Sequence, residues 1–445
     1  MQVHLLTTPE ALEALRSDWV ALQDRVSQTS VFMTWEWQFL WWKHYGQGQP
    51  LRVLVVQEGE KVLGILPLYL QTRRVFRFFP VRLLRNVGTG GDTTPDDLDP
   101  LIDPAQAGAV VAALVDALLT QPMGQDLICL ADFQPGSEFA RQLRVRSQAL
   151  GRTAQEATSA TITFTGLPTR WNTYLESLHR DRRNVIRRFR RKLEGAAGAR
   201  LFTWTDAQTL DQGIDRLIEL NRARWAGRGG QAFGSEAYCG FHRELMHALF
   251  AQGRLRLHGA EVDGRIVALL YCYRFRDRVL YFQGGFDPAQ AALRPGLTLM
   301  GHAIEQAIEE GAQVFDMLRG EYDFKSQWAK QKRRTAQTTV FEGSLAAALW
   351  RLRMQLLPPA KRFLQPLQRP LSPLMRCHAA TAHSRSRSPI SRTAISRAAS
   401  WPAATCTASA SPAPSWKAPI CARPTCAGRT SRAATPSGRC SPARN

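Results

Sequence analysis

Apolar positions along the first part of the chain alternate between a helical spacing and the short runs that are typical of buried strands. Leu12, Leu15 and Trp19 repeat at intervals of three and four residues, which predicts a helix over residues 9–26. This alternation of periods indicates a mixed α/β fold. The same criteria predict helices at 34–45, 104–120 and 137–147, and strands at 52–57, 61–70, 81–87, 126–133 and 160–165.

The second part of the chain ends in a stretch around which the rest is organised. Pro295 suits the first position of a helix, because its missing N–H would have no intrahelical partner there. Leu297, Met300 and Ile304 give this helix one apolar face, and Gly311 ends it before a short strand at 314–318. The elements predicted before it are helices at 207–225 and 235–252, and strands at 200–205, 254–262, 265–275 and 279–284.

The two predicted hairpins resemble each other. Residues 57–69 (QEGEKVLGILPLY) align without gaps to residues 261–273 (EVDGRIVALLYCY). Both hairpins follow a pair of predicted helices and precede a further strand. This order is expected of two copies of one α/β unit.

Between the first strands and the helix at 104–120 lies a loop, residues 88–103, with five aspartates and three glycines. It lacks the alternate-position ligands and the terminal glutamate of a calcium loop. We therefore interpret it as a flexible polar loop and as a candidate to face substrate.

Ionisable side chains gather where the strand at 314–318 ends. Gly320 breaks the pattern, and Asp316, Glu321, Tyr322, Asp323 and Lys325 lie on either side of it. Ligands of open α/β sheets usually bind at the carboxyl ends of strands. The sequence therefore predicts a functional site in this stretch.

The segment from Arg180 to Lys192 holds eight basic residues in thirteen. On a helix, Val185, Ile186 and Phe189 would form one apolar stripe while the arginines cover the rest. Two interpretations stay open. The helix is either a solvated face that docks by its stripe, or a surface whose repelling charges are neutralised by an anion such as a phosphorylated ligand or an acidic lipid.

Composition changes abruptly after Met375. The chain has 445 residues and a formal net charge of +21, and residues 376–445 contribute eleven Lys or Arg and no Asp or Glu. This tail also has no Leu, Val or Phe, so it cannot bury enough apolar area to offset its ordering entropy. We expect a disordered basic tail, produced by translation out of frame or, alternatively, serving as a basic arm for nucleic acid.

The cysteines and the N-terminus indicate where the protein works. Cys129, Cys239 and Cys272 are far apart and the other five lie in the tail, so neither a disulfide framework nor a metal site is expected. The first residues show no signal peptide, and no run of eighteen apolar residues occurs. We expect a cytoplasmic protein without a transmembrane segment.

Four segments carry a resemblance to a known family: RDRRNVIRRFRRKLE (180–194), ELNRARWAGRG (219–229), RPGLTLMGHAIEQAIEEG (294–311) and FDMLRGEYDFKSQW (315–328). They resemble the GNAT acyltransferase fold, and more specifically the CelD/BcsL-type proteins linked to cellulose and exopolysaccharide synthesis, which are related to the Fem peptidyltransferases. FMTWEWQFLWW (32–42) agrees in the first half, so the resemblance covers about 340 residues. It implies two GNAT-like units packed together: residues 1–168 and 169–345, followed by a helical extension at 346–375 and the tail.

The resemblance also implies a donor site. GNAT proteins hold the pyrophosphate of acyl-coenzyme A at a helix N-terminus, where free N–H groups favour an anion. The loop of this chain has fewer glycines than is usual, so an aminoacyl-transfer-RNA donor, as in the Fem relatives, stays open. Carried over, the cofactor-binding residues are Gln283, Gly284, Gly285 and Phe286 beside the pantetheine arm, and Arg294, Gly296, Leu297 and Thr298 at the pyrophosphate.

Acyl transfer requires a base and groups that stabilise the developing charge. Asp316, Glu321 and Asp323 are candidate bases, with Glu321 preferred; Tyr322 is the candidate acid and Lys325 the candidate partner of the base or of a phosphate. Ordinary salt bridges at a helix start are the alternative role for these groups. The candidate acceptor-binding residues are Arg182, Arg183, Arg187, Arg224, Trp225 and Trp328.

From these expectations the chain is an acyltransferase that moves an acyl group, with acetyl expected, from acyl-coenzyme A to an amine or hydroxyl of a sugar or envelope precursor. Two alternatives remain. The first is an aminoacyltransferase that uses charged transfer RNA, and the second is a non-catalytic accessory protein of the polysaccharide-synthesis machinery.

Overall fold

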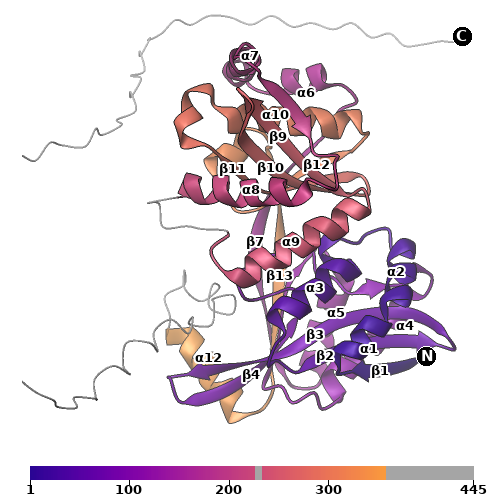
Figure 1. The fold of residues 1–445 in the computed structure, drawn as a ribbon. Helices are drawn as coiled ribbons and strands as arrows, with labels where there is room; N and C mark the ends of the chain where they lie inside the picture. The colour runs from indigo at the N-terminus through magenta and orange to yellow at the C-terminus, as the bar shows by residue number, and fades with distance from the viewer. Residues whose placement is uncertain (226–232, 357–445) are drawn as a thin grey trace, which may run out of the picture. The chain divides into compact units, whose positions relative to one another are not determined.

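The computed structural model describes residues 1–225 and 233–356 (Figure 1). These residues belong to one unit. The predicted tail at 376–445, and the part of the predicted helical extension beyond 356, lie outside the described residues.

The first half of the chain forms the predicted alternation of helices and strands. Leu15 separates two short helices where the sequence predicted one, and η1 (Val31–Met33) precedes a helix rich in tryptophan. The elements are β1 (Gln2–Leu6), α1 (Pro9–Ala14), α2 (Arg16–Arg25), α3 (Trp35–Tyr45), β2 (Leu51–Glu58), β3 (Lys61–Val75), β4 (Phe79–Asn86), β5 (Leu101–Ile102), η2 (Pro104–Gln106), α4 (Ala107–Thr120), β6 (Leu127–Phe133), α5 (Glu138–Ala149) and β7 (Thr153–Gly166).

The second half begins with two additional helices, repeats this order and ends in one further helix. The elements are α6 (Trp171–Ser177), α7 (Arg180–Glu194), β8 (Arg200–Thr203), α8 (Leu210–Trp225), α9 (Glu236–Ala251), β9 (Leu255–Val262), β10 (Arg265–Phe275), β11 (Arg278–Phe286), η3 (Pro288–Leu293), α10 (Pro295–Glu309), β12 (Val314–Arg319), α11 (Asp323–Ser326), β13 (Gln331–Phe341) and α12 (Leu345–Leu356).

All the strands join one sheet, whose order shows the internal repeat directly. The path runs β1-β2-β3-β4-β6-β13-β7-β12-β11-β10-β9-β8, with β5 paired to β3. The series β1-β2-β3-β4-β6 and β8-β9-β10-β11-β12 therefore lie at opposite ends in mirrored order. The mixed α/β fold and the internal repeat that the sequence predicted are confirmed.

The middle of the sheet is made by an exchange of strands. β13 comes from the end of the second half but pairs with β6 of the first, while β7 ends the first half and pairs with β12 of the second. β13 and β7 then pair with each other over eleven residue pairs. β13 is not predicted from the sequence, because QKRRTAQTTVF has no apolar run.

The tryptophans of α3 lie in a core that both halves share. Trp37 and Trp41 are buried, and the Trp37 ring meets Phe241 of α9 edge-on at a centroid distance of 5.0 Å. One apolar cluster joins α3 to residues of α8 and α9. Figure 1 shows α3 and α9 lying beside each other.

The interpretation of the aspartate loop, residues 88–103, as flexible is wrong. Most of its residues are buried or half-buried. Its carboxylates connect the halves: Asp92 accepts from Ser235, Asp96 pairs with Arg319, and Asp97 pairs with Arg333. Basic partners far away in the sequence cannot be recognised from the loop's own composition.

Candidate functional site

Two central strands of the second half separate after a short parallel contact. β11 and β12 pair only at Arg278–Val314, Val279–Phe315 and Leu280–Asp316, although β11 continues to Phe286. Beyond Leu280, the edge of β11 that faces β12 has no strand partner among the described residues. The gap opens toward the N-terminus of α10.

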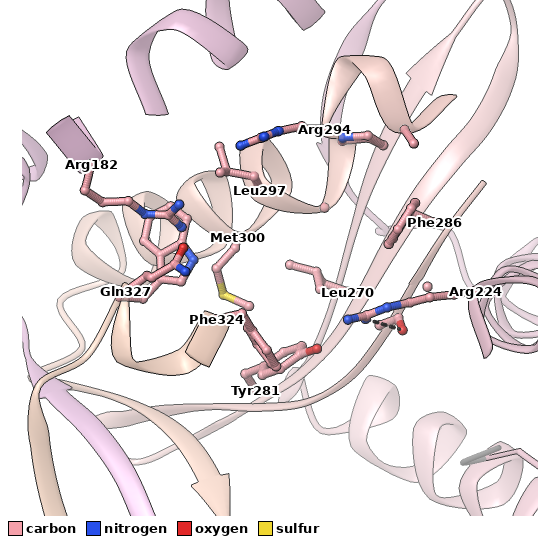
Figure 2. A pocket seen from close by; sticks show the side chains of 16 residues that line it. Arg182, Arg224, Leu270, Tyr281, Phe286, Arg294, Leu297, Met300, Phe324 and Gln327 are labelled. Carbon is pink, nitrogen blue, oxygen red and sulfur yellow. Dashed lines mark hydrogen bonds between the residues drawn. The ribbon is translucent and has the colours of Figure 1, made fainter. Parts of the chain in front are cut away.

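A cavity of about 290 Å³ lies at this gap, and we call it the splay cavity. Figure 2 shows Arg182 and Arg224 approaching it from opposite sides, with Arg294 and Leu297 at the start of α10. Its lining residues are Arg182, Arg224, Leu270, Tyr281, Gly284, Gly285, Phe286, Ala291, Arg294, Pro295, Gly296, Leu297, Met300, Phe324, Gln327 and Trp328.

Three arginines line the splay cavity without an acidic partner. Within residues 1–225 and 233–356, no carboxylate lies within 4.0 Å of Arg182, Arg224 or Arg294. Their guanidinium groups instead contact aromatic rings and one backbone carbonyl oxygen. Arg182 Cζ lies 4.6 Å from the Trp328 ring centroid, Arg294 Cζ lies 4.7 Å from that of Phe189, and Arg224 Nη1 donates to Gly284 O at 3.5 Å.

The charge of Arg182 is the least satisfied of the three. Its Nε is buried and has no hydrogen-bond partner in the described part of the chain. Burial lowers the pKa of Arg182, and the neighbouring positive charge of Arg294 lowers it further. A ligand anion would relieve both effects, because it restores the interactions that burial removes.

The N-terminus of α10 is shaped to meet such an anion. Arg294 adopts a left-handed conformation, with φ of 47°, and Pro295 occupies the first turn without an N–H of its own. The Thr298 hydroxyl is buried and has no partner among the described residues, although Thr298 does not line the splay cavity. A helix N-terminus also carries a partial positive charge, so donors and charge converge here.

β11 approaches α8 so closely that only glycine fits at one position. A Cβ at Gly285 would lie 2.3 Å from the backbone nitrogen of Asn221. The Asn221 amide in turn donates to Gly284 O at 3.0 Å. These contacts fix the wall of the splay cavity that the predicted residues Gly284 and Gly285 form.

A second cavity, of about 700 Å³, adjoins the splay cavity, and we call it the cleft cavity. Both cavities are lined by Arg224, Tyr281 and Phe324. The other residues of the cleft cavity are Thr94, Ser159, Ala160, Thr161, Trp225, Phe282, Gln283, Met317, Leu318, Arg319, Gly320, Glu321, Tyr322 and Lys325.

Three of the predicted catalytic residues meet at the cleft cavity. Lys325 is buried, and its Nζ donates to Leu318 O at 3.2 Å and to Arg319 O at 2.5 Å. Burial lowers the pKa of Lys325 to about 8. Glu321 is exposed and pairs with Lys332 at 2.5 Å, which lowers the pKa of its carboxyl group.

Tyr322 is also exposed, and Lys325 Nζ lies 5.4 Å from the centroid of its ring. Among the described residues that line the cleft cavity, Glu321 is the one carboxylate. The cavity therefore presents a carboxylate, a phenol and an ammonium group along one wall.

Asp316 and Asp323 are not brought to either cavity, which argues against both as bases. Asp316 is buried and bonded to Arg333 Nη2 at 3.1 Å. Its neighbours Phe315 and Met317 face the core under α10, so Asp316 points to the other face of the sheet. Asp323 is exposed at the first turn of α11, the position where a carboxylate favours a helix.

Asp316 belongs to a buried network that joins the halves. Arg319 lies 2.7 Å from both Asp96 and Asp132, and Arg333 bonds Asp97 and Asp316. Burial raises the pKa of Asp97 to about 7, although Arg333 opposes this shift. These groups hold the fold together where β12 and β13 meet the first half.

The predicted acceptor-binding residues separate into three places. Arg182 and Trp328 lie in the splay cavity beside Arg294, and Trp225 lines the cleft cavity. Arg224 lines both. Arg183 and Arg187 lie on α7 and line neither cavity, which argues against an acceptor role for them. Gln283 lines the cleft cavity rather than the splay cavity.

Several residues that complete the walls of the splay cavity are not predicted from the sequence. Tyr281, Met300, Phe324 and Gln327 resemble ordinary core or loop residues in the sequence, because their role depends on which strands separate. The sequence does contain one signal that α10 is the counterpart of α4. The tetrapeptide Asp-Pro-Ala-Gln occurs at 103–106 and again at 287–290, just before α4 and α10.

Comparisons with known proteins agree with this geometry. Residues 180–326 match the family model described as "Acetyltransferase (GNAT) domain". The chain therefore carries a GNAT acetyltransferase domain and is an acyltransferase. No curated protein sequence matches the chain significantly.

Among solved structures, FemX has the same fold, with a TM-score of 0.53 at 14% identity over 79% of this chain and 99% of that chain. Two other similar structures have lower scores. The C-terminal domain of a putative lysylphosphatidylglycerol synthetase from Agrobacterium fabrum has a TM-score of 0.46 at 10% identity, over 77% and 95%. A tandem GNAT protein from the clavulanic acid biosynthesis pathway has a TM-score of 0.42 at 14% identity, over 77% and 100%.

Two further findings describe the same part of the chain. No helix within residues 1–225 and 233–356 is long and apolar enough to cross a membrane. The described residues also hold no group of three His, Cys, Asp or Glu placed to bind a metal ion. GNAT folds typically use acyl-coenzyme A.

Proposed function

We propose that the splay cavity binds acyl-coenzyme A by its phosphates. The observation that carries this proposal is the set of three arginines that face one cavity without acidic partners among the described residues. Arg182 and Arg224 are half-buried and Arg294 is exposed, and a half-buried cation without an acidic partner is stabilised when an anion binds beside it. Arg182 and Arg294 meet the pyrophosphate beside the N-terminus of α10, and the pantetheine arm follows the unpaired edge of β11 toward Tyr281.

The acceptor then occupies the cleft cavity. Arg224, Tyr281 and Phe324 border both cavities, so the thioester lies where the two meet. An acceptor amine or hydroxyl attacks the thioester carbon, the C–S bond breaks, and the acceptor's proton passes to Glu321. Tyr322 gives its phenolic proton to the leaving thiolate, and the proton held by Glu321 then passes through solvent to the Tyr322 phenolate. The Lys325 ammonium stabilises the oxyanion.

The acceptor class rests on the resemblance to the CelD/BcsL-type proteins, together with the size of the cleft cavity. A sugar or another envelope or polysaccharide precursor with a free amine or hydroxyl fits a cavity of about 700 Å³ that is lined by Trp225, Tyr322 and polar groups. Acetyl is the acyl group that we propose. The two units 1–168 and 169–345 remain the proposed domain division, with the site built mostly by the second.

Calorimetric titration with acetyl-coenzyme A tests the donor site. The double variant Arg182→Gln/Arg294→Gln should weaken binding by at least about a hundredfold, because charge-assisted hydrogen bonds contribute about 1.5–3 kcal/mol each. Arg187→Gln is the matched control, since Arg187 lies on the same helix as Arg182 but lines neither cavity. If wild-type protein binds no acetyl-coenzyme A, the proposal is contradicted, and the alternative of a non-catalytic accessory protein is favoured.

One observation favours aminoacyl-transfer RNA as an alternative donor. α7 places Arg183, Arg187, Arg188 and Arg191 along its surface, and no carboxylate among the described residues lies within 4.0 Å of them. Phe189 of α7 also contacts Arg294, so this basic face continues to the splay cavity. A polyanion could bind along it.

Competition separates the two donors. Transfer RNA that displaces acetyl-coenzyme A, with a binding constant that falls steeply with salt and falls again in Arg187→Gln/Arg191→Gln, would support the alternative. Binding of acetyl-coenzyme A that transfer RNA does not affect at low salt would eliminate it.

A further inference from the structure

The tip of the β3–β4 hairpin exposes three aromatic side chains among arginines. Phe76, Phe78 and Phe79 have exposed fractions of 41%, 77% and 48%. Arg74 and Arg77 lie in the same turn and are exposed. Folded proteins rarely expose three neighbouring aromatic side chains to solvent, so we expect the hairpin tip to contact a binding partner.

The backbone of this turn is unfavourable for the residues it holds. Phe76 and Arg77 have φ of 47° and 69°, a conformation that glycine and asparagine adopt readily and bulky side chains rarely do. The turn therefore keeps Phe and Arg at a conformational cost. Such a cost at an exposed position is a reason to look for function there.

α12 carries a second exposed apolar face beside the hairpin. One face of the helix packs on β3 and β4 through Ala347 and Trp350, which join a core cluster with Val75 and Val81. On the opposite face, Leu345, Leu352 and Leu356 are exposed by 74%, 46% and 68%. Their spacing of seven and four residues places them in one row.

The hairpin and α12 are in direct contact. Arg353 of α12 donates to Arg74 O at 3.1 Å, which fixes the end of α12 against the strand that leads to the tip. Figure 1 shows α12 alongside the β4 side of the hairpin. We call these exposed phenylalanines and leucines, with Arg74, Arg77, Arg351 and Arg353, the hairpin surface.

The charge of the hairpin surface has one sign. None of its four arginines has a carboxylate within 4.0 Å among residues 1–225 and 233–356. Arg82, further along β4, is paired with Asp126 and does not add to it. The combination of exposed aromatic and leucine side chains with unpaired arginines is complementary to a lipid bilayer that carries anionic headgroups.

We propose that the hairpin surface binds the protein to the surface of an anionic membrane. Phe76, Phe78 and Phe79 enter the interface between headgroups and acyl chains, where aromatic rings are favoured, and the arginines contact lipid phosphates. The leucines of α12 lie against the same interface. This inference is independent of the donor and acceptor sites, none of whose residues belong to the hairpin surface.

Co-sedimentation of the full chain with vesicles tests the proposal. Wild-type protein should bind vesicles of phosphatidylglycerol and phosphatidylcholine more tightly than vesicles of phosphatidylcholine alone. Phe76→Ser/Phe78→Ser/Phe79→Ser should weaken binding to the anionic vesicles by more than about tenfold. The matched control is Val145→Ser/Leu150→Ser, which removes apolar groups that are 50% and 49% exposed elsewhere.

The charge contribution is tested separately. Arg74→Gln/Arg77→Gln should weaken binding by about thirtyfold at low salt, whereas Arg187→Gln/Arg191→Gln on α7 should leave it within about twofold. An equal loss of vesicle binding in both double variants would show that the overall positive charge of the protein, and not the hairpin surface, attracts the vesicles. This result would overturn the proposal.

Insertion of the tip has its own measurement. The Phe78→Trp variant should gain fluorescence that brominated lipids quench, relative to the wild-type chain under the same conditions. Wild-type protein that does not bind anionic vesicles, a triple Phe→Ser variant that binds as well as wild type, or added fluorescence in Phe78→Trp that brominated lipids leave unchanged would each contradict the proposal.

Discussion

The two halves of the sheet share one strand order but differ in what lies between their two central strands. In the first half, β4 and β6 pair at Leu83–Leu127 and Leu84–Ile128, and the Asn86 side chain then accepts from Ala131 N at 3.0 Å. A side chain thus bridges the strands just beyond their pairing. In the second half the Arg278–Asp316 ion pair, at 3.8 Å, lies within the paired part of β11 and β12. Beyond Leu280 no side-chain hydrogen bond or ion pair bridges these strands among the described residues, and the splay cavity occupies the gap.

The helices that follow show the same contrast. Both begin after the sequence Asp-Pro-Ala-Gln, and both aspartates cap the turn that follows them. In the first half α4 starts at once, and Asp103 is neutralised by Arg25 and Lys61. In the second half four more residues, 291–294, precede α10 and end in Arg294, which has no acidic partner among the described residues.

With the donor site that we propose, one of the two similar units serves as a scaffold and the other binds the ligand. The first half fills its gap with hydrogen bonds and ion pairs within the protein. The second leaves cations and strand edges unsatisfied, at a cost that a bound anion offsets. The variants below test this division, from the largest expected effect to the smallest.

Arg319→Met breaks the connection between the halves. It leaves the buried Asp96 and Asp132 without their shared cation, and removing one partner of a buried ion pair costs about 3–5 kcal/mol. Denaturant unfolding should show a loss of that size in the free energy of unfolding. Arg187→Met, at an exposed position, should change the free energy of unfolding by less than about 0.5 kcal/mol. An equal loss in the two variants would mean that the buried ion-pair network does not stabilise the contact between the halves.

Glu321→Gln tests whether the second half alone performs the chemistry. The amide cannot accept the acceptor's proton, so kcat should fall by about a hundredfold while the dissociation constant for acetyl-coenzyme A stays unchanged. Coenzyme A release with a saturating amine acceptor gives kcat. A wild-type rate would remove Glu321 from the mechanism.

The pH dependence of turnover sharpens the role of Lys325. Its pKa is about 8, and the proposed role requires the ammonium form, so kcat should fall as pH rises through about 8. Lys325→Met should lower kcat and abolish this limb of the profile. Turnover that instead rises through the same pH range would show that Lys325 acts as a neutral base.

Much of the fold could be predicted from the sequence because apolar periodicity reports which face of each element is buried. The meander β9-β10-β11, the helix at Pro295 and the mirrored first hairpin all follow from it. β13 could not be predicted in this way, since its polar residues are held by backbone pairing to β6 and β7. The burial of loop 88–103 depends on Arg319 and Arg333, which the chain brings there only after folding.

The site was predictable in part for the same reason. Arg294, Gly284, Gly285 and Phe286 were expected together and line one cavity. Arg182 was expected to meet the acceptor, but the docking of α7 on α10 puts it beside Arg294. Asp316 looked like a strand-end base, because alternation along a strand does not reveal which face carries the ligand.

Hydrogen–deuterium exchange with and without acetyl-coenzyme A tests the division between the halves most directly. The ligand should protect amides of residues 281–300, along the free part of β11 and the start of α10, and should leave the corresponding residues 79–111 of the first half unchanged. Protection of residues 79–111, alone or to the same extent, would contradict that division.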